Sequence, residues 1–101
     1  MARYRMSDSM VVDTDKATAS WQEATRWDGR NHISLATGTQ WDHQTLYRSK
    51  RGRFYIEYSS DWQGSTPSAE WISNEEAVRW LMLNNHEVPE YLAALVDEVT
   101  E

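Results

Sequence analysis

Four basic side chains lie within six residues near the middle of the chain, and they are its clearest candidates for binding chemistry. They are Arg48, Lys50, Arg51 and Arg53, and aromatic residues flank them in the stretch LYRSKRGRFYIEY at 46–58. Arginine and lysine beside aromatic rings can contact phosphate, or can anchor a contact with another protein. Either use would place this stretch on the surface.

Part of this stretch matches a nucleic-acid motif. RGRFYIEY at 51–58 resembles the RNA-recognition consensus K/R-G-F/Y-G/A-F-V-x-F/Y. Five positions fit that consensus: Arg51, Gly52, Tyr55, Ile56 and Tyr58. Phe54, however, stands where a small residue must let a base approach. We therefore expect nucleic acid to be at most a weak partner, touched by the basic residues through its phosphates.

The histidines offer little for catalysis or metal binding. His32, His43 and His86 are spread over the chain, and none has a second ligand at metal-binding spacing. The chain has no cysteine, no glycine-rich phosphate loop and no nucleophile motif. A relay of His43 with Asp42 would need the histidine in a cleft with a hydrogen-bonded carboxylate. We predict that the protein is not an enzyme and has no catalytic, metal or cofactor site.

Charge is unevenly distributed along the 101 residues. Residues 1–56 carry nine basic and six acidic side chains, whereas residues 57–101 carry ten acidic ones and a single basic one, Arg79. The net charge of −6 disfavours nucleic acid as the main partner. No apolar run approaches the ~18 residues of a membrane span, and the first residues lack a signal-peptide core. We expect a cytoplasmic protein with no membrane partner.

The spacing of apolar residues around the basic stretch predicts a β-hairpin. Residues 50–52 separate two β-prone runs, which suits a three-residue loop with Gly52 in the left-handed conformation. Such a loop places Tyr47 opposite Tyr55. Alternation then divides the hairpin into a core face and an outer face. The core face carries Leu46, Phe54, Ile56 and Tyr58, and the outer face carries Tyr47, Tyr55 and Glu57.

Strands are also predicted at 32–35 and 69–73, and two helices follow them. Ser73 opens a capping box for the first helix, which runs to about Leu83, where Asn84 and Asn85 can supply a left-handed C-terminal residue. Pro89 suits the first turn of a second helix. That helix would pack through Leu92, Leu95, Val96 and Val99.

These elements predict an α+β fold, an antiparallel three- to four-stranded β-meander with a C-terminal two-helix hairpin packed on one face. The chain is long enough for one domain. We divide the single domain 1–101 into an N-terminal arm at 1–31, the β-meander at 32–73 and the helical hairpin at 74–99. The arm is the least regular part, and its four apolar residues at roughly helical spacing fit either a short helix or an ordered arm.

Two helices can cover only one face of the sheet, so the tyrosines on the other face need another cover. Either the arm covers them through Trp21 and Trp27, or they are exposed to a partner protein or to a second copy in a homodimer. We predict a non-enzymatic, protein-binding or regulatory protein whose contact surface is the outer sheet face and the basic hairpin tip. The predicted partner-binding residues are Tyr47, Arg48, Lys50, Arg51, Arg53, Tyr55 and Trp62.

An alternative surface is the acidic outer side of the predicted helices, represented by Glu90, Asp97 and Glu98. Such a surface can compete for a basic groove that normally binds nucleic acid. The stretches ISLATGTQWDHQTLYRSKRGRFYIEYSSDWQGS and ISNEEAVRWLMLNN resemble small uncharacterised proteins of bacteria, plasmids and phages, with the pattern ATGxQWxHxxLYRSxxGR. The resemblance implies no particular activity but a context of mobile elements, whose small acidic proteins include anti-CRISPR and anti-restriction inhibitors that bind a host protein. The alternative hypothesis is therefore inhibition of a host defence nuclease through the acidic surface. A weak nucleic-acid binder is the third hypothesis.

Overall fold

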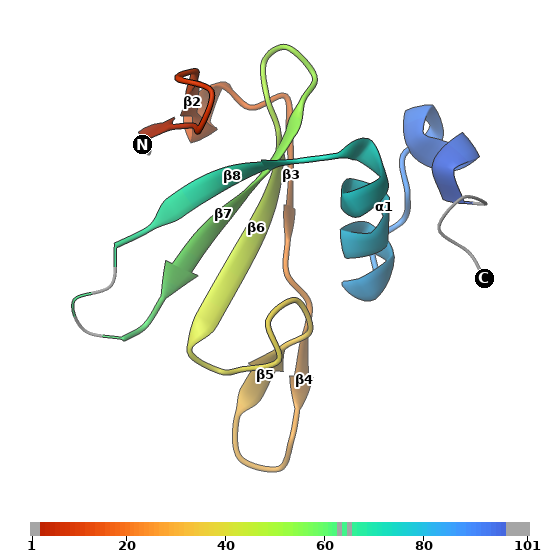
Figure 1. Ribbon diagram of the computed structural model, residues 1–101. Coiled ribbons are helices and arrows are strands. Elements are labelled where there is room, and N and C mark those ends of the chain that lie inside the picture. Colours follow the sequence, from red (N-terminus) through yellow and green to blue (C-terminus); the bar gives the residue numbers. More distant parts are fainter. Residues whose placement is uncertain (1–2, 63, 65, 97–101) are drawn as a thin grey trace.

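A four-stranded antiparallel sheet lies at the centre of the computed structural model, which describes residues 3–62, 64 and 66–96 (Figure 1). The strand order is β3-β6-β7-β8. The strands are β3 (Ala19–Gln22), β6 (Asp42–Arg48), β7 (Phe54–Ser60) and β8 (Ser68–Ile72). Strands β6, β7 and β8 form the predicted meander, whereas the fourth strand comes from the N-terminal region.

The predicted β6–β7 hairpin and its register are confirmed. Tyr47 pairs with Tyr55 across the ladder. Gly52 has a φ of 89°, in the left-handed region that glycine adopts at least cost, and its N–H donates to the carbonyl of Ser49 at 2.9 Å. The tight loop and the alternation of side chains together determine which residues share a face.

Of the two alternatives for the N-terminal region, the short helix is wrong, and the ordered arm consists of short strands. They include a hairpin of β1 (Arg3–Arg5) and β2 (Val11–Asp13), followed by a 3-10 turn, η1 (Thr14–Lys16), and then by β3. Strand β4 (Thr25–Trp27) pairs with β5 (His32–Ser34) in a separate two-stranded sheet. The strand predicted at 32–35 therefore lies outside the meander. Three-residue strands show too little alternation to be recognised, and their pairing partners decide where they lie.

The first helix agrees with its predicted signals. Helix α1 (Asn74–Leu83) begins after Ser73, whose Oγ accepts a hydrogen bond from the N–H of Glu76 at 3.1 Å. At its other end Asn85 has a φ of 61°, the left-handed conformation that ends many helices. The capping residues therefore fixed both ends of α1.

The prediction of a second α-helix, which would complete the helical hairpin, is wrong. After Pro89 the chain forms a six-residue 3-10 helix, η2 (Glu90–Leu95), in which the N–H of Leu92 donates to the carbonyl of Pro89 at 2.9 Å. Leu92 is buried, so η2 still packs against α1. A short helix that buries one large side chain gains little to offset its nucleation cost. Val99 lies outside the described residues.

The fold-class prediction is therefore also wrong. The described residues form eight strands in three sheets and a single α-helix of 10 residues, so this part of the protein is mostly β. Both faces of the main sheet are covered. Helix α1 and η2 pack on one face, where the buried cluster is Leu46, Phe54, Ile56, Ala77, Val78, Trp80, Leu81 and Leu92. The β1–β2 hairpin packs on the other face, where the buried cluster is Met6, Val12 and Tyr55.

Candidate functional site

The outer sheet face is covered by the N-terminal hairpin, which settles the alternative that the sequence left open. Tyr55 is fully buried beneath Met6 and Val12, and Tyr47 stacks on its ring with a centroid distance of 5.2 Å. The N-terminal arm thus covers Tyr55, but it does so through Met6 and Val12 and not through Trp21 or Trp27. The ring of Tyr55 therefore presents no surface to a partner protein, and Tyr47 is only partly accessible.

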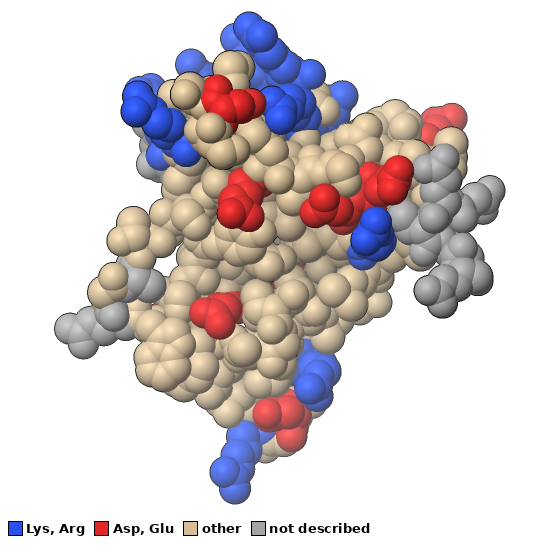
Figure 2. All heavy atoms as spheres, viewed as in Figure 1, with Lys and Arg blue, Asp and Glu red and all other residues tan. Residues whose placement is uncertain are grey.

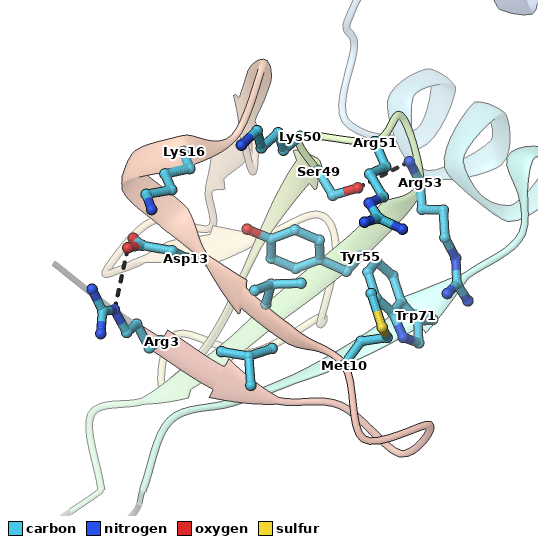
Figure 3. Close-up of a pocket in the computed structure, with 12 residues that line it drawn as sticks. Arg3, Met10, Asp13, Lys16, Ser49, Lys50, Arg51, Arg53, Tyr55 and Trp71 are labelled. Atoms are coloured by element: carbon cyan, nitrogen blue, oxygen red, sulfur yellow. Dashed lines mark hydrogen bonds and ion pairs between the residues drawn. The ribbon is translucent and has the colours of Figure 1, made fainter.

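The hairpin leaves part of this face open beside the β6–β7 turn, and a pocket of about 680 Å³ lies there (Figure 3). We call it the cationic pocket. Strand β2 and its flanking residues form one wall, and the turn at 49–53 forms another. The lining residues are Arg3, Met10, Val11, Val12, Asp13, Lys16, Ser49, Lys50, Arg51, Arg53, Tyr55 and Trp71.

Five of the lining residues are cationic and one is acidic. Asp13 neutralises Arg3, whose Nε donates to its Oδ2 at 3.3 Å. The remaining cations include three that form no ion pair with any described residue, namely Lys16, Lys50 and Arg51. In the space-filling view a group of lysine and arginine side chains lies at the top of the molecule, over the N-terminal hairpin and the β6–β7 turn, while others lie at the lower end and at the right (Figure 2). This end of the protein therefore carries a local positive charge, although the net charge of the chain is −6.

Arg53 is fixed in place by two contacts. Its Nη1 donates to Oδ2 of Asp8 at 2.9 Å, and its guanidinium lies 3.9 Å from the centroid of the Trp71 ring. The indole N–H of Trp71 donates to the other carboxylate oxygen of Asp8 at 3.0 Å. The hydrogen bonds from Trp71 and Arg53 lower the pKa of Asp8 to about 2. Arg53 thus stiffens the edge of the pocket, and Asp8 balances its charge.

Tyr55 contributes an unusual group to the floor of the pocket. Its Oη is buried and has no hydrogen-bond partner. Burial, with the nearby Tyr47 and Glu57, raises the pKa of the Tyr55 hydroxyl to about 12. The hydroxyl therefore keeps its proton at neutral pH and is available as a donor.

Arg48, another predicted partner-binding residue, belongs to the opposite face of the sheet. Its guanidinium lies 4.9 Å from the centroid of the Tyr91 ring in η2, and its Nη1 donates to Oγ1 of Thr18 at 3.2 Å. Strand alternation explains this position, because Arg48 follows the outward Tyr47 and so shares the core face with Leu46. It is not part of the cationic pocket.

Trp62 is also separate from the basic residues. It lies beyond the far end of β7, where its ring packs against Trp41 with a centroid distance of 5.0 Å. A seven-residue strand separates this pair from the β6–β7 turn, a span of about 20 Å at ~3.3 Å per residue. Of the predicted set, only Lys50, Arg51, Arg53 and the buried Tyr55 line the cationic pocket.

Of the three residues that represent the alternative acidic surface, Glu90 lies in the described part of the chain. Glu90 is exposed at the start of η2, where the sequence predicts an α-helix. Asp97 and Glu98 lie outside the described residues. With a 3-10 helix of six residues in its place, the continuous acidic helix face that the sequence predicts is not formed by the described chain.

His43 lies beside a second pocket and is held between two carboxylates, neither of which belongs to Asp42. Its Nδ1 is 3.0 Å from Oε2 of Glu23, and its Nε2 is 2.9 Å from Oδ2 of Asp61. The hydrogen bonds to Glu23 and then to Asp61 raise the pKa of His43. The pocket and the hydrogen-bonded carboxylates are what a relay through His43 would need, although the carboxylates come from Glu23 and Asp61 and not from Asp42. The geometry is that of a clamp between two loops.

Several pocket residues were not predicted from the sequence: Arg3, Met10, Asp13, Lys16 and Trp71. One signal could have suggested Lys16, because it and Lys50 are the only lysines of the chain. No group of histidine, cysteine and acidic side chains suited to a metal ion occurs among the described residues.

Comparisons with protein-family models, with curated proteins and with solved structures find no match for this chain. No described helix is long and apolar enough to cross a membrane. The fold and site therefore define the protein by themselves, as a small, mostly β protein with a cationic pocket between its N-terminal hairpin and the β6–β7 turn.

Proposed function

We propose that this is a non-enzymatic binding protein that contacts an acidic segment of a partner protein through the cationic pocket and the adjoining β6–β7 turn. The observation that carries the proposal is the set of three cations with no ion-pair partner among the described residues: Lys16, Lys50 and Arg51. Unpaired positive charges at one end of a protein attract negatively charged surfaces and speed their association.

The surroundings of these cations also suit a protein contact. Met10 and Val11 are exposed beside them, and the half-buried Trp71 lies at the edge of the pocket. Apolar and aromatic side chains next to arginine are typical of the residues that contribute most to protein interfaces.

The two lysines provide a selective test. A carbodiimide couples a lysine amine directly to a carboxylate that touches it, and both lysines of this chain line the cationic pocket. After treatment of a lysate of the native host, we expect crosslinked peptides that join Lys16 or Lys50 to Asp or Glu of one partner protein. Their yield should fall as salt rises from about 0.05 to 0.5 M, because salt screens exposed charges.

Charge-reversal variants test whether the partner binds the cationic pocket or another surface of the protein. We expect Lys50→Glu with Arg51→Glu to abolish the crosslinks through Lys16, which keeps its amine in that variant, and Arg30→Glu, in the β4–β5 hairpin at the opposite end of the molecule, to leave all crosslinks unchanged (Figure 1). Retention of the same partner by the double variant would overturn the proposal. So would loss of the partner after Glu90→Lys, or after nuclease treatment, since these outcomes assign binding to the acidic surface or to nucleic acid.

A further inference from the structure

The buried hydroxyl of Tyr55 lies in the cationic pocket without a hydrogen-bond partner. Figure 3 shows it pointing toward the side of the pocket where Lys16 and Lys50 project. We propose that the pocket binds a phosphate monoester, whose phosphate accepts a hydrogen bond from Tyr55 and is neutralised by the two lysines. The inference deepens the proposed function and rests on it, because the same surface makes both contacts.

The charge of the pocket favours phosphate over a carboxylate. Asp13 is the one acid that lines the pocket, and Arg3 pairs with it, while Asp8 outside the lining pairs with Arg53. The lysines and Arg51 form no ion pair with a described residue, although Lys16 lies close enough to Asp13 to help lower the pKa of its carboxyl. A phosphate monoester carries a charge of about −1.5 to −2 at neutral pH and has three acceptor oxygens, so it balances several cations where a carboxylate balances one.

The hydroxyl of Tyr55 gives the site a directional donor. A buried polar group without a partner is costly, and buried tyrosine hydroxyls usually have one. A phosphate oxygen would satisfy this donor. The raised pKa of Tyr55, caused first by burial, keeps the proton on the hydroxyl while the ligand binds.

The apolar part of the lining indicates what the phosphate is attached to. The pocket of about 680 Å³ is within the usual range of small-molecule sites, about 300 to 1,000 Å³, and is far larger than a phosphate group. Met10, Val11, Val12 and Trp71 provide apolar surface beside the cations. This combination suits an organic group, preferably flat and apolar, that is joined to phosphate by a single ester bond.

The position of Tyr55 is set before any ligand arrives. Its ring is packed between Tyr47, which stacks on it, and Trp71, which meets it edge-on at a centroid distance of 5.8 Å. The contacts of Arg53 with Asp8 and Trp71 hold the adjoining edge. The ring therefore holds the donor in one position, although the side chains that cover the buried hydroxyl must move aside before a phosphate oxygen can reach it.

Calorimetric titration with phenyl phosphate tests the inference, with benzoate as a control that has the same ring and a single negative charge. We expect phenyl phosphate to bind at low salt, at least about fivefold more tightly than benzoate, because two charges and an extra oxygen engage the site. No detectable binding of phenyl phosphate, or equal affinities for the two compounds, would overturn the inference.

Tyr55→Phe isolates the hydroxyl. The substitution removes an oxygen that has no partner in the free protein, so the variant should fold as the wild type does. We expect its affinity for phenyl phosphate to fall about 5- to 10-fold. Lys16→Gln, at an exposed position, should weaken binding about 3-fold or more, and Arg30→Gln should not change it. Wild-type affinity in both Tyr55→Phe and Lys16→Gln would show that the pocket is not the site.

Two further ligands distinguish the source of the ester. A phosphotyrosyl peptide that binds more tightly than phenyl phosphate assigns the ester to a side chain of the partner protein. A nucleoside monophosphate that binds more tightly than that peptide assigns it to a free metabolite. If phenyl phosphate does not bind but the carbodiimide crosslinks persist, the phosphate inference is wrong and the acidic-protein contact stands. If phenyl phosphate binds but no crosslinks form, the phosphate inference stands and the acidic-protein contact is wrong.

Discussion

The hydroxyl of Tyr4 donates a hydrogen bond of 2.7 Å to Oε2 of Glu57, which lies 53 positions later in the chain. The bond ties β1 to β7, and so fastens the N-terminal hairpin to the main sheet. Two-stranded hairpins are marginal in water on their own. The hairpin that covers Tyr55 and forms one wall of the cationic pocket therefore depends on this bond and on the burial of Met6 and Val12.

Tyr4→Phe should loosen the hairpin. Burial and the hydrogen bond to Glu57 raise the pKa of Tyr4, so its hydroxyl is a donor throughout the physiological range. We expect the free energy of unfolding to fall by about 1 to 2 kcal/mol, because a hydrogen bond to a charged acceptor is lost. Urea denaturation measures this change. Tyr91→Phe, at an exposed ring, is the matched control, and an equal effect of the two substitutions would contradict the prediction.

The His43 clamp should make stability depend on pH. The pKa of His43 in the folded protein is raised above its ordinary value of 6.5 by Glu23 and Asp61. The clamp therefore contributes fully below about pH 6.5, and its contribution is lost as pH rises through the raised folded-state pKa. Melting temperatures measured across that range should fall in the wild type and fall less in His43→Gln.

His32→Gln controls for the loss of a histidine as such. His32 packs against Trp27 in the β4–β5 hairpin and has no ion pair with a described residue. The melting temperature of the His32→Gln variant should change with pH as that of the wild type does. Identical pH profiles for the wild type and His43→Gln would rule the clamp out as a source of pH dependence.

Gly52→Ala should destabilise the β6–β7 turn for two reasons. The φ of 89° is strained for any residue with a side chain, and an added Cβ would lie 3.0 Å from Nη2 of Arg48. Gly38→Ala shares the positive φ, at 77°, but its Cβ would meet nothing within 4 Å. Strain alone costs about 1 kcal/mol. Denaturation midpoints should show a larger loss at Gly52, and an equal loss would mean that Arg48 moves aside freely.

Asn84→Ala, at the residue that caps the C-terminal end of α1, should be strongly destabilising. The side chain of Asn84 is buried, its Oδ1 accepts a hydrogen bond from the N–H of Ala24 at 3.0 Å, and its Nδ2 donates to the carbonyl of Trp80 at 2.8 Å. Alanine would leave the N–H of Ala24 without its partner. We expect a loss of about 2 to 3 kcal/mol in urea denaturation. Asn74→Ala, on an exposed first turn, should cost less than 1 kcal/mol, and similar values at both sites would refute this role of Asn84.

Parts of the fold that depend on neighbouring residues were predictable. The β6–β7 register follows from the short turn, and the start of α1 follows from Ser73 and Glu76, three positions apart. The C-terminal 3-10 helix was not predictable, because the same apolar spacing fits either helix type until the packing of Leu92 is known. The N-terminal strands were missed because their pairing partners, not their own side chains, hold them in extended form.

The candidate site also has features that the sequence predicts and features that only the tertiary structure shows. Alternation places Tyr47 and Tyr55 together, and the basic turn follows from Arg51 and Arg53, so the sequence by itself determined these neighbours. It could not place the N-terminal hairpin over Tyr55, because that contact joins residues more than 40 positions apart. Only the tertiary structure decided that the hydroxyl of Tyr55 is buried beside the two lysines, since hydrophobic burial is non-directional and no local pattern specifies its partner.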